Sequence, residues 1–531
     1  MSARDDLGAA ARSKFWILLT TSLVSSLIML DSNIVAVSLP AIGRALRASF
    51  REIEWVISAY LLSYAALLLG AGAYADLCGR RKAMLIGLVL FAIASGGCGL
   101  AQSSLVLNLA RAVQGVGGAL LLTAALAIIS DTFAGAERGR AFAIWGAALG
   151  IALTTGPIVG GVITKLFGWR WVFLVNVPAC AVLIFATIAV VKESRDPKAK
   201  RLDSLGILTF SPGLFLLVWA LIDGNDAGWS AAPILFRFLC AAVCFVVFVL
   251  VEFRQERPMV DFYLFKRPTF LGSVFAMMGY GAAAQVMIFY LPLFLQNAYG
   301  FEPAKAGLAM IPFALPMVVT PRLTTNLTNH FSGRALLTGG LAVTLIGNLL
   351  FWELSRSKRP YPIFILSMLV AGTGAGLLNG ETVKVLGGSV PPERAGMASG
   401  LASTTRFIGI LVGTAGLGAV LSNVVRANFV MAALTIGLNP TAATGAARRV
   451  TSGDLSGMLN AAPKILQEQL RSAGLAAFAD GFAAASLLAA IVAAIASVLV
   501  FVFVRSEETA PTAAPAEKHH RCMAVDCRHP I

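Results

Sequence analysis

Charged residues are scarce in this 531-residue chain: Asp, Glu, Lys and Arg together make up 13% of it. A soluble globular protein carries roughly 25%. Hydrophobic residues make up 57%, so the composition excludes an ordinary soluble fold and predicts a helical protein with many membrane spans. The formal net charge of +15 would suggest a nucleic-acid partner in a soluble domain, but most Lys and Arg residues lie in short segments between apolar runs. We therefore expect a lipid bilayer around the chain and no nucleic acid.

Histidines are also few, and all four (330, 519, 520 and 529) lie outside the apolar runs. This excludes a histidine cluster at membrane depth, and with it an intramembrane metalloenzyme of that type. The seven cysteines are scattered and show neither a disulfide framework nor zinc spacing. No G-x-x-x-x-G-K-[ST] motif is present, so an ion gradient is a better energy source than ATP. We expect no metal, no cofactor and no enzymatic activity. Nor does the first apolar run end in a cleavage pattern, so no cleavable signal is expected.

The apolar runs predict an all-α integral membrane protein with fourteen spans. We place the spans at 15–39, 53–74, 83–102, 105–130, 140–166, 171–191, 204–222, 233–251, 268–294, 304–326, 335–352, 361–386, 395–422 and 475–504. An even number of spans places both termini on the same side of the membrane. Cations gather in alternate loops, such as Arg80 to Lys82 and 192–203, which predicts cytoplasmic termini.

A repeated motif suggests that the chain consists of two related halves. Gly79-Arg80 and Gly333-Arg334 each directly precede an apolar run, and the two runs are eight spans apart. Two six-helix bundles give this offset if two extra helices lie between them. We therefore divide the chain as follows: a cytoplasmic segment 1–14, a first bundle 15–191, a linker with two inserted helices 192–267, a second bundle 268–504 with a long external loop 423–474, and a disordered cytoplasmic tail 505–531.

Three ionisable residues lie deep in the predicted spans: Asp31, Arg111 and Arg406. Such groups are costly in a bilayer and usually functional. At 1.5 Å per residue, Asp31 lies about 22 Å and Arg111 about 21 Å from the cytoplasmic edge. They can therefore meet at one depth.

Their pairing has two interpretations. Arg111 would hold Asp31 ionised while burial favours the neutral acid, and this opposition suits a carboxyl that takes up and releases a proton. Alternatively, the two form a static ion pair that fixes packing. Arg406 has no evident partner at its own depth, so it either bonds a backbone carbonyl or contacts an acidic group of a substrate. Glu381 and Lys384 fit an interfacial ion pair better than a second proton site.

The loop after the second span contains Gly72, Asp76, Gly79, Arg80 and Arg81. The glycines permit a tight turn, and the aspartate can cap a helix. The loop is either a latch between the halves in one conformation or a plain solvated turn. We refer to it as the Asp76 loop.

The fifth span is rich in glycine: Gly146, Gly150, Gly156, Gly160 and Gly161, with Pro157 among them. Small residues at this spacing let a neighbouring membrane helix approach closely, and the proline should bend the helix. This span is a candidate hinge, although its role could also be purely architectural.

Several motifs together resemble the major facilitator superfamily, in particular its fourteen-helix branch of drug:proton antiporters. These motifs are Leu30 to Pro40, Gly72 to Met84, Leu109 to Gly117, Gly146 to Gly161, Trp169 to Pro178, Leu291 to Gln296 and Ala306 to Pro312. The resemblance covers about residues 15–504. One departure is Leu77, which stands where the loop signature usually has a basic residue.

The resemblance implies two helical bundles that rock about a central site. It implies a proton-coupled exporter of drug-like or amphipathic toxic molecules in the plasma membrane of a bacterium. Asp31 and Arg111 would couple the proton, and Arg406 and Gln114 are candidate substrate contacts. Where the bacterium has two membranes, a periplasmic adaptor protein is a further candidate partner. Alternatives are an importer on the same fold, export of an endogenous metabolite, and a membrane sensor or scaffold. The sequence leaves the charge of the substrate open.

Overall fold

A computed structural model describes residues 3–133, 135–195, 203–255, 260, 262–328, 330–390, 395–506 and 509. These residues form helices and short connections, without strands. Thirteen helices in this part of the chain are long and apolar enough to cross a membrane, and the bent α2 makes a fourteenth. The predicted all-α fold with fourteen spans is confirmed.

The first six spans pack largely against one another. They comprise α1 (Ala3–Leu46), α2 (Phe50–Cys78), α3 (Arg80–Leu100), α4 (Ser104–Thr132), α5 (Gly135–Leu166), and a sixth span broken into α6 (Trp171–Leu174) and α7 (Asn176–Val190). Ser49 begins α2 with a capping box, in which its side chain and that of Glu52 each accept the other's backbone N–H. The first helix starts at residue 3, so the expected separate segment 1–14 is instead largely a continuation of α1.

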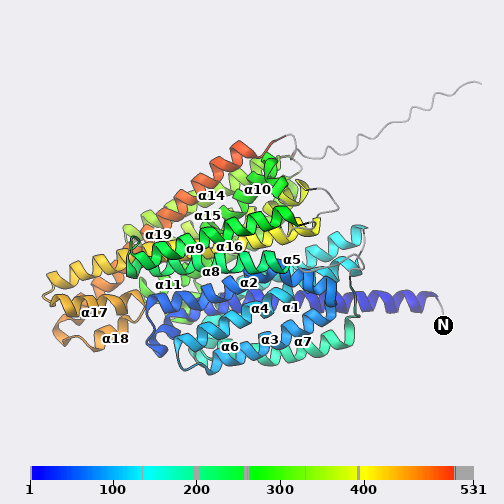
Figure 1. Ribbon diagram of the computed structural model, residues 1–531. Helices are drawn as coiled ribbons and strands as arrows, with labels where there is room; N and C mark the ends of the chain where they lie inside the picture. The colour runs from blue at the N-terminus through cyan, green and yellow to red at the C-terminus, as the bar shows by residue number, and fades with distance from the viewer. Residues whose placement is uncertain are drawn as a thin grey trace, which may run out of the picture.

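The two inserted helices are α8 (Ser204–Ala227) and α9 (Ala232–Arg254). They pack against each other, and α8 also contacts both α2 and α16 (Ala395–Thr435), so it bridges the two groups of six spans (Figure 1). Ile207 of α8 presses on Gly70 of α2, and α2 bends by 53° between Leu68 and Gly70. No proline or other sequence signal in the second span predicts this bend.

The last six spans follow a short helix, η1 (Phe262–Lys266). They are α10 (Pro268–Gly279) with η2 (Tyr280–Gln285) and α11 (Met287–Asn297), α12 (Pro303–Leu308) with α13 (Ile311–Leu327), α14 (Gly333–Arg356), α15 (Tyr361–Gly388), α16, and α19 (Gln467–Phe503). The segment η2 is a π-helix inside the predicted span 268–294. Such segments are often found at functional sites.

The expected long loop 423–474 is corrected by the structure. Helix α16 continues to Thr435, two short helices follow, α17 (Pro440–Thr451) and α18 (Leu455–Asn460), and after the single turn η4 (Lys464–Leu466) α19 begins at Gln467. Alanine favours helix, and polar residues on the extended helices pair with each other, as Asn428 does with Asp480 at 3.0 Å. We call the end of the molecule that carries α17 and α18 the cap end, and the opposite end, where α1 begins and α19 stops, the terminal end (Figure 1).

The predicted disorder of the tail 505–531 falls mostly on residues outside the described part of the chain. The described residues at its start are attached to the protein: the backbone N–H of Arg505 donates to Thr269, and that of Arg334 donates to Thr509.

Candidate functional site

Asp31 of α1 and Arg111 of α4 meet inside the first six spans. The Arg111 guanidinium donates to Asp31 Oδ2 at 2.6 Å, and the two side chains are 1% and 0% exposed. Arg111 Nε also donates to the carbonyl of Val56 on α2 at 3.0 Å. Helix α4 can approach α2 this closely because residue 115 is a glycine, where a Cβ would meet Ser63 and the backbone of Tyr60. The contact between Asp31 and Arg111 that their depth predicts is confirmed.

Amides complete the environment of Asp31. Asp31 Oδ1 accepts from Gln114 at 3.0 Å and from Asn176 at 2.7 Å, and both amides also donate to Ser95. Gln114 is fully buried and its carbonyl oxygen accepts from Arg111 at 2.7 Å. Its side chain therefore belongs to the Asp31 network in this conformation, and the substrate contact that the sequence suggests would require this network to open. Ser95 was missed because it lies alone in an apolar run.

Tyr60 of α2 connects this network to the interface between the halves. The Arg111 guanidinium lies over the Tyr60 ring at 4.2 Å from its centroid. Tyr60 stacks on Tyr64 at 5.9 Å, and Tyr64 makes an edge contact with Phe407 of α16 at 4.4 Å. All three rings line a cavity of about 30 Å³ between α1, α2, α11 and α16, which we call the central pocket. Its further lining residues are Ile28, Met29, Ser32, Asn33, Leu61, Gln285, Ile288, Phe289 and Ile410.

Arg406 lies beside the central pocket on α16. Its guanidinium is 5.1 Å from the centroid of the Phe407 ring, and no described carboxylate lies within ion-pair distance of it. Among the described residues, the buried Nε of Arg406 and the buried Oε1 of Gln285 both lack a hydrogen-bond partner. Gln285 is the last residue of the π-helix η2 and was not identified from the sequence. Unsatisfied buried polar groups are costly, so this arrangement suits a polar ligand that satisfies them.

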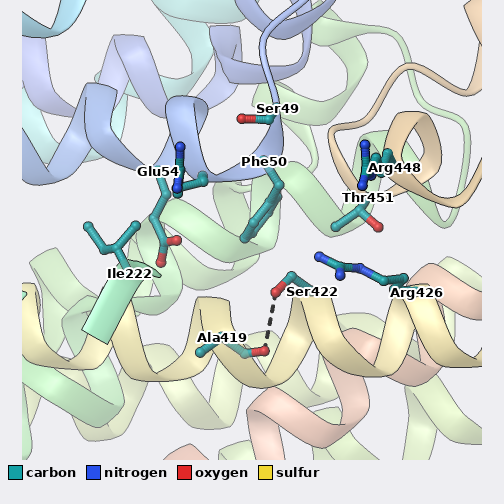
Figure 2. Close-up of a pocket in the computed structure, with 10 residues that line it drawn as sticks. Ser49, Phe50, Glu54, Ile222, Ala419, Ser422, Arg426, Arg448 and Thr451 are labelled. Atoms are coloured by element: carbon teal, nitrogen blue, oxygen red, sulfur yellow. Dashed lines mark hydrogen bonds between the residues drawn. The ribbon is translucent and has the colours of Figure 1, made fainter. Parts of the chain in front are cut away.

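A second cavity, of about 320 Å³, lies at the cap end, and we call it the cap pocket. It is lined by Ser49, Phe50, Arg51 and Glu54 from α2 and its N-cap, Ile222 from α8, Ala419, Ser422 and Arg426 from α16, and Arg448 and Thr451 from α17. Figure 2 shows Glu54 on one side of the pocket near Ile222, and Arg426, Arg448 and Thr451 on the other. The cap pocket escaped sequence analysis because its residues come from four separated segments.

The glycines of α5 differ in what surrounds them. A Cβ at Gly156 would lie 2.5 Å from Asn33 Cβ, and one at Gly160 would lie 2.7 Å from the Ile34 carbonyl oxygen, so both hold α5 against α1. Gly161 faces the Pro303 carbonyl of α12, and in return Gly307 of α12 faces the Pro157 carbonyl. By contrast, a Cβ at Gly150 would make ordinary contact with Val318, and one at Gly146 would meet nothing within 4 Å. Only part of the predicted glycine pattern is therefore tightly packed.

The halves also meet through polar contacts at the cap end. Gln296 of α11 donates to the Val37 carbonyl of α1 at 2.8 Å, and Lys165 of α5 pairs with Glu302 at 2.7 Å. On α16, Gly418 leaves room for the Glu54 carboxylate of α2, because a Cβ there would collide with it. These contacts join α1, α2 and α5 to the second half.

The Asp76 loop lies at the terminal end. Arg80 pairs with Asp76 at 2.9 Å and with Asp131 of α4 at 3.2 Å, so Asp76 has an ionic partner although residue 77 is a leucine. Gly79 has φ +119°, which favours glycine, and Glu193 accepts from the backbone N–H groups of Arg81 and Lys82. Asp76, Arg80 and Asp131 belong to the first six spans, and Glu193 follows directly after the sixth. Glu193 and Asp131 were not identified from the sequence.

Glu381 and Lys384 of α15 lie 3.7 Å apart, with the lysine 59% exposed and the glutamate 4% exposed. This contact matches the predicted interfacial ion pair. Among the described residues, no group of three or more His, Cys, Asp and Glu side chains is placed to hold a metal ion.

Fourteen helical spans in two groups of six with an inserted pair, a small and mainly apolar pocket between the groups and an ion pair buried beside it define a membrane transporter. The sequence profile of the Major Facilitator Superfamily matches residues 21–414 and 269–507. The chain belongs to this superfamily, as the motifs suggested.

Several relatives show the same affiliation, and solved structures share the fold. The chain is 35% identical over 412 residues to the multidrug resistance protein Stp of Mycobacterium tuberculosis, covering 77% of this chain and 76% of that one. It is 31% identical over 495 residues to the multidrug efflux pump LfrA of Mycolicibacterium smegmatis, covering 93% and 97%. A bacterial homolog of the human lysosomal transporter Spinster has the same fold, with a TM-score of 0.60, 16% identity and coverage of 95% and 99%.

Proposed function

We propose that this protein exports drug-like or otherwise amphipathic small molecules in exchange for protons. The observation that carries the proposal is the buried Asp31–Arg111 pair, which lies one aromatic ring away from a pocket between two helical halves. The names of the relatives Stp and LfrA agree with multidrug export. Export of an endogenous metabolite on the same fold is the second candidate.

The contacts suggest how a proton would be coupled to transport. As a carboxylate, Asp31 accepts hydrogen bonds from Arg111, Gln114 and Asn176. Protonation would remove the charge that holds Arg111, and the guanidinium would then move relative to the Tyr60 ring on which it lies. Because Tyr60 and Tyr64 line the central pocket, that movement would change the contact between α2 and α16.

The two halves, residues 15–191 and 268–504, would rock as units about this pocket. Helix α5 would serve as the hinge, because Gly156 and Gly160 hold it to α1 while Gly161 holds it to α12. The Asp76 loop, including Gly72 and Arg81, would act as a latch at the terminal end. Among the described residues its ion pairs lie within one half, and we expect it to engage the other half in a different conformation.

The distribution of cations supports an orientation in the membrane. Arg80 to Lys82 and the cations of 192–203 would face the cytoplasm together with both termini. The cap end would then face outward from the plasma membrane of a bacterium. In a bacterium with two membranes, that end would be the surface available to a periplasmic adaptor.

The pockets favour a substrate with an acidic or strongly accepting group. Asp31 is enclosed with Arg111 and is 0% exposed, whereas Arg406 lies next to Phe407 of the central pocket, 5.1 Å from that ring, and has no described carboxylate partner. A ligand in that pocket would therefore meet a cation before it met an anion, and the aromatic rings of Tyr64 and Phe407 would contact its apolar part.

Inverted membrane vesicles with an imposed pH gradient test the proposal. Wild-type protein should accumulate substrate when the vesicle interior is acid, and Asp31→Asn should reduce this uptake to background. Asp31→Glu, which keeps the carboxyl group, should retain part of the uptake. The matched control is Asp480→Asn, because Asp480 bonds Asn428 away from the Asp31 network.

Each result has a distinct meaning. Normal gradient-driven uptake by a correctly inserted Asp31→Asn protein would show that the Asp31–Arg111 pair is static. Uptake in the opposite direction would instead support an importer.

A further inference from the structure

A cavity of about 690 Å³ lies between α2, α4 and the inserted helix α8, and we call it the lateral groove. Its volume falls in the range of ligand pockets, about 300–1,000 Å³. Ala59 and Leu62 of α2 are buried at its floor, whereas Leu105 and Leu109 of α4 are 67% and 60% exposed at its edge. Because these leucines lie in a membrane span, their exposed surface faces the hydrocarbon of the bilayer. The lateral groove therefore opens to lipid.

The charged residues of the lateral groove gather at the cap end. Arg51 and Glu52 lie in the first turn of α2, and Asp223 lies near the end of α8. From there the lining residues extend about 24 Å along α2, about 18 Å along α8 and, from Ser104, about 12 Å along α4. One leaflet contributes about 15 Å of a bilayer's hydrocarbon core. The groove thus spans about one leaflet, with its charged end at the level of the headgroups.

Aromatic residues agree with this placement. Trp55 of α2 and Trp219 of α8 both line the groove about one turn from its charged end, and the Trp219 indole donates to Asp223 at 2.9 Å. Tryptophan is enriched at this level of a membrane, because its ring has an apolar body and a polar N–H. The Phe215 ring lies 6.1 Å from that of Trp55 and 5.4 Å from that of Trp219, so the three rings form one apolar wall.

Asn108 of α4 supplies an unused hydrogen-bond acceptor in the groove. Its amide nitrogen donates to the Glu52 carbonyl at 3.2 Å, whereas its buried Oδ1 has no hydrogen-bond partner among the described residues. The neighbouring carboxylates are already bonded, since Glu52 accepts from Ser104 and Asp223 accepts from Arg237 at 2.7 Å. A buried acceptor without a donor is costly. A ligand that brings an N–H or O–H to this end of the groove would satisfy it.

We propose that the lateral groove binds one phospholipid of the leaflet at the cap end, with an acyl chain in its apolar part and a hydrogen-bond donor of the headgroup on Asn108 Oδ1. The bilayer itself supplies this occupant, because the groove opens to hydrocarbon and matches one leaflet in length. Ethanolamine and glycerol headgroups carry N–H or O–H donors. Choline carries neither, so it cannot satisfy an acceptor. The proposal does not depend on the export function.

A lipid in this position would also hold the inserted pair in place. It would contact α2, α4 and α8 at once, and α8 packs in turn against α16 of the second half. Loss of the lipid would leave a gap between α4 and α8 and remove their shared contact. We therefore expect the bound lipid to stabilise the attachment of α8 to the first half.

Helix α4 provides two neighbouring residues for a matched test. Ala112 lines the lateral groove, whereas Val113 lies outside its lining and is 45% exposed. A phenylalanine at residue 112 would occupy the space of the acyl chain, and one at residue 113 would extend into bulk lipid. Ala112→Phe and Val113→Phe thus place the same side chain on the same helix, but only the first fills the groove.

The first experiment measures lipid binding to the purified full-length protein in detergent by native mass spectrometry. Phosphatidylethanolamine, phosphatidylglycerol and phosphatidylcholine with identical chains are titrated separately. Wild-type protein should bind one molecule of either of the first two, and Ala112→Phe should weaken this binding about 10-fold or more, the effect of displacing about two buried methylenes. Val113→Phe should change it less than about 2-fold. Undiminished binding by Ala112→Phe, or equal losses in the two variants, would overturn the groove as the site.

The second experiment tests the headgroup contact with substitutions of similar size. Wild-type protein should bind phosphatidylethanolamine and phosphatidylglycerol about 5-fold or more tightly than phosphatidylcholine, the effect of one hydrogen bond. Asn108→Leu, which lacks the acceptor, should bind all three within about 2-fold, and Asn108→Asp, which keeps it, should retain the preference. A wild-type protein without the preference, or Asn108→Leu with it, would contradict the role of Asn108.

Thermal unfolding gives a readout that does not require a filled-groove variant to fold. Phosphatidylethanolamine should raise the Tm of wild-type protein more than phosphatidylcholine does, and the two lipids should act equally on Asn108→Leu. Displacement of the bound lipid by a fluorescent export substrate would assign the groove to substrate and overturn the lipid proposal. If wild-type protein exports nothing but retains the lipid through Asn108, the proposed function fails and the lipid site stands. If it exports normally and binds no lipid, the site alone fails.

Discussion

The two deep arginines of this chain have opposite surroundings. Arg111 is 1% exposed and is neutralised by Asp31 at 2.6 Å, so it forms a closed unit within the first half. Arg406 borders the seam between the halves, and no described carboxylate neutralises it. The difference arises because α4 faces α1, which carries an aspartate at that depth, whereas α16 faces aromatic residues of α2. One half thus encloses an ion pair, and the other holds an arginine without a described carboxylate beside the seam.

The largest expected effect comes from breaking the enclosed pair. Arg111→Met should lower the free energy of unfolding by about 3–5 kcal/mol, because it leaves the carboxylate of Asp31 buried without its cation. Thermal unfolding in detergent measures the loss. The double variant Asp31→Asn with Arg111→Met should recover much of the stability, since no charge then remains buried. A stable single variant would show that Asp31 does not depend on Arg111.

An intermediate effect on stability is expected for α5, the helix that packs against both halves near the Asp31–Arg111 pair. Gly156→Ala places a methyl group 2.5 Å from Asn33, two residues beyond Asp31, and should cost about 1–3 kcal/mol through overpacking while slowing transport. The matched control is Gly146→Ala, where a Cβ meets nothing within 4 Å, and its stability should be unchanged or slightly higher. Unfolding and transport assays on both variants test this. Equal behaviour of the two would remove the hinge from α5.

The smallest effect on stability should come from Arg406, the arginine without a described carboxylate partner. Arg406→Gln should change the free energy of unfolding by less than about 1 kcal/mol, because no ion pair is broken. It should nevertheless reduce the affinity for acidic substrates about 10-fold or more, the value of a hydrogen bond to a charged group. Fluorescence titrations with an acidic substrate give the affinities of the wild-type protein and of Arg406→Gln. A large loss of stability would mean that Arg406 is structural, like Arg111.

The sequence was sufficient for the spans and for the Asp31–Arg111 contact, because apolar length and helical rise are local quantities. It was insufficient wherever partners came from distant segments. Ser95 and Gln285 are single polar residues in apolar runs, and their roles depend on which helices surround them. The cap pocket needs α2, α8, α16 and α17 together. The boundaries at 422 and 475 were wrong because polar side chains such as Asn428 ended the apolar pattern without ending the helix.

The inserted helix α8 has a mechanical consequence. It contacts α2 in one half and α16 in the other, so it connects the two halves along one side of their interface. A rigid body held at one edge swings most at the edge farthest from the support. We therefore expect the halves to rotate about an axis near α8. The displacement between the halves should be greatest at the contacts farthest from α8. The inserted pair would in this way set the axis of the transport cycle.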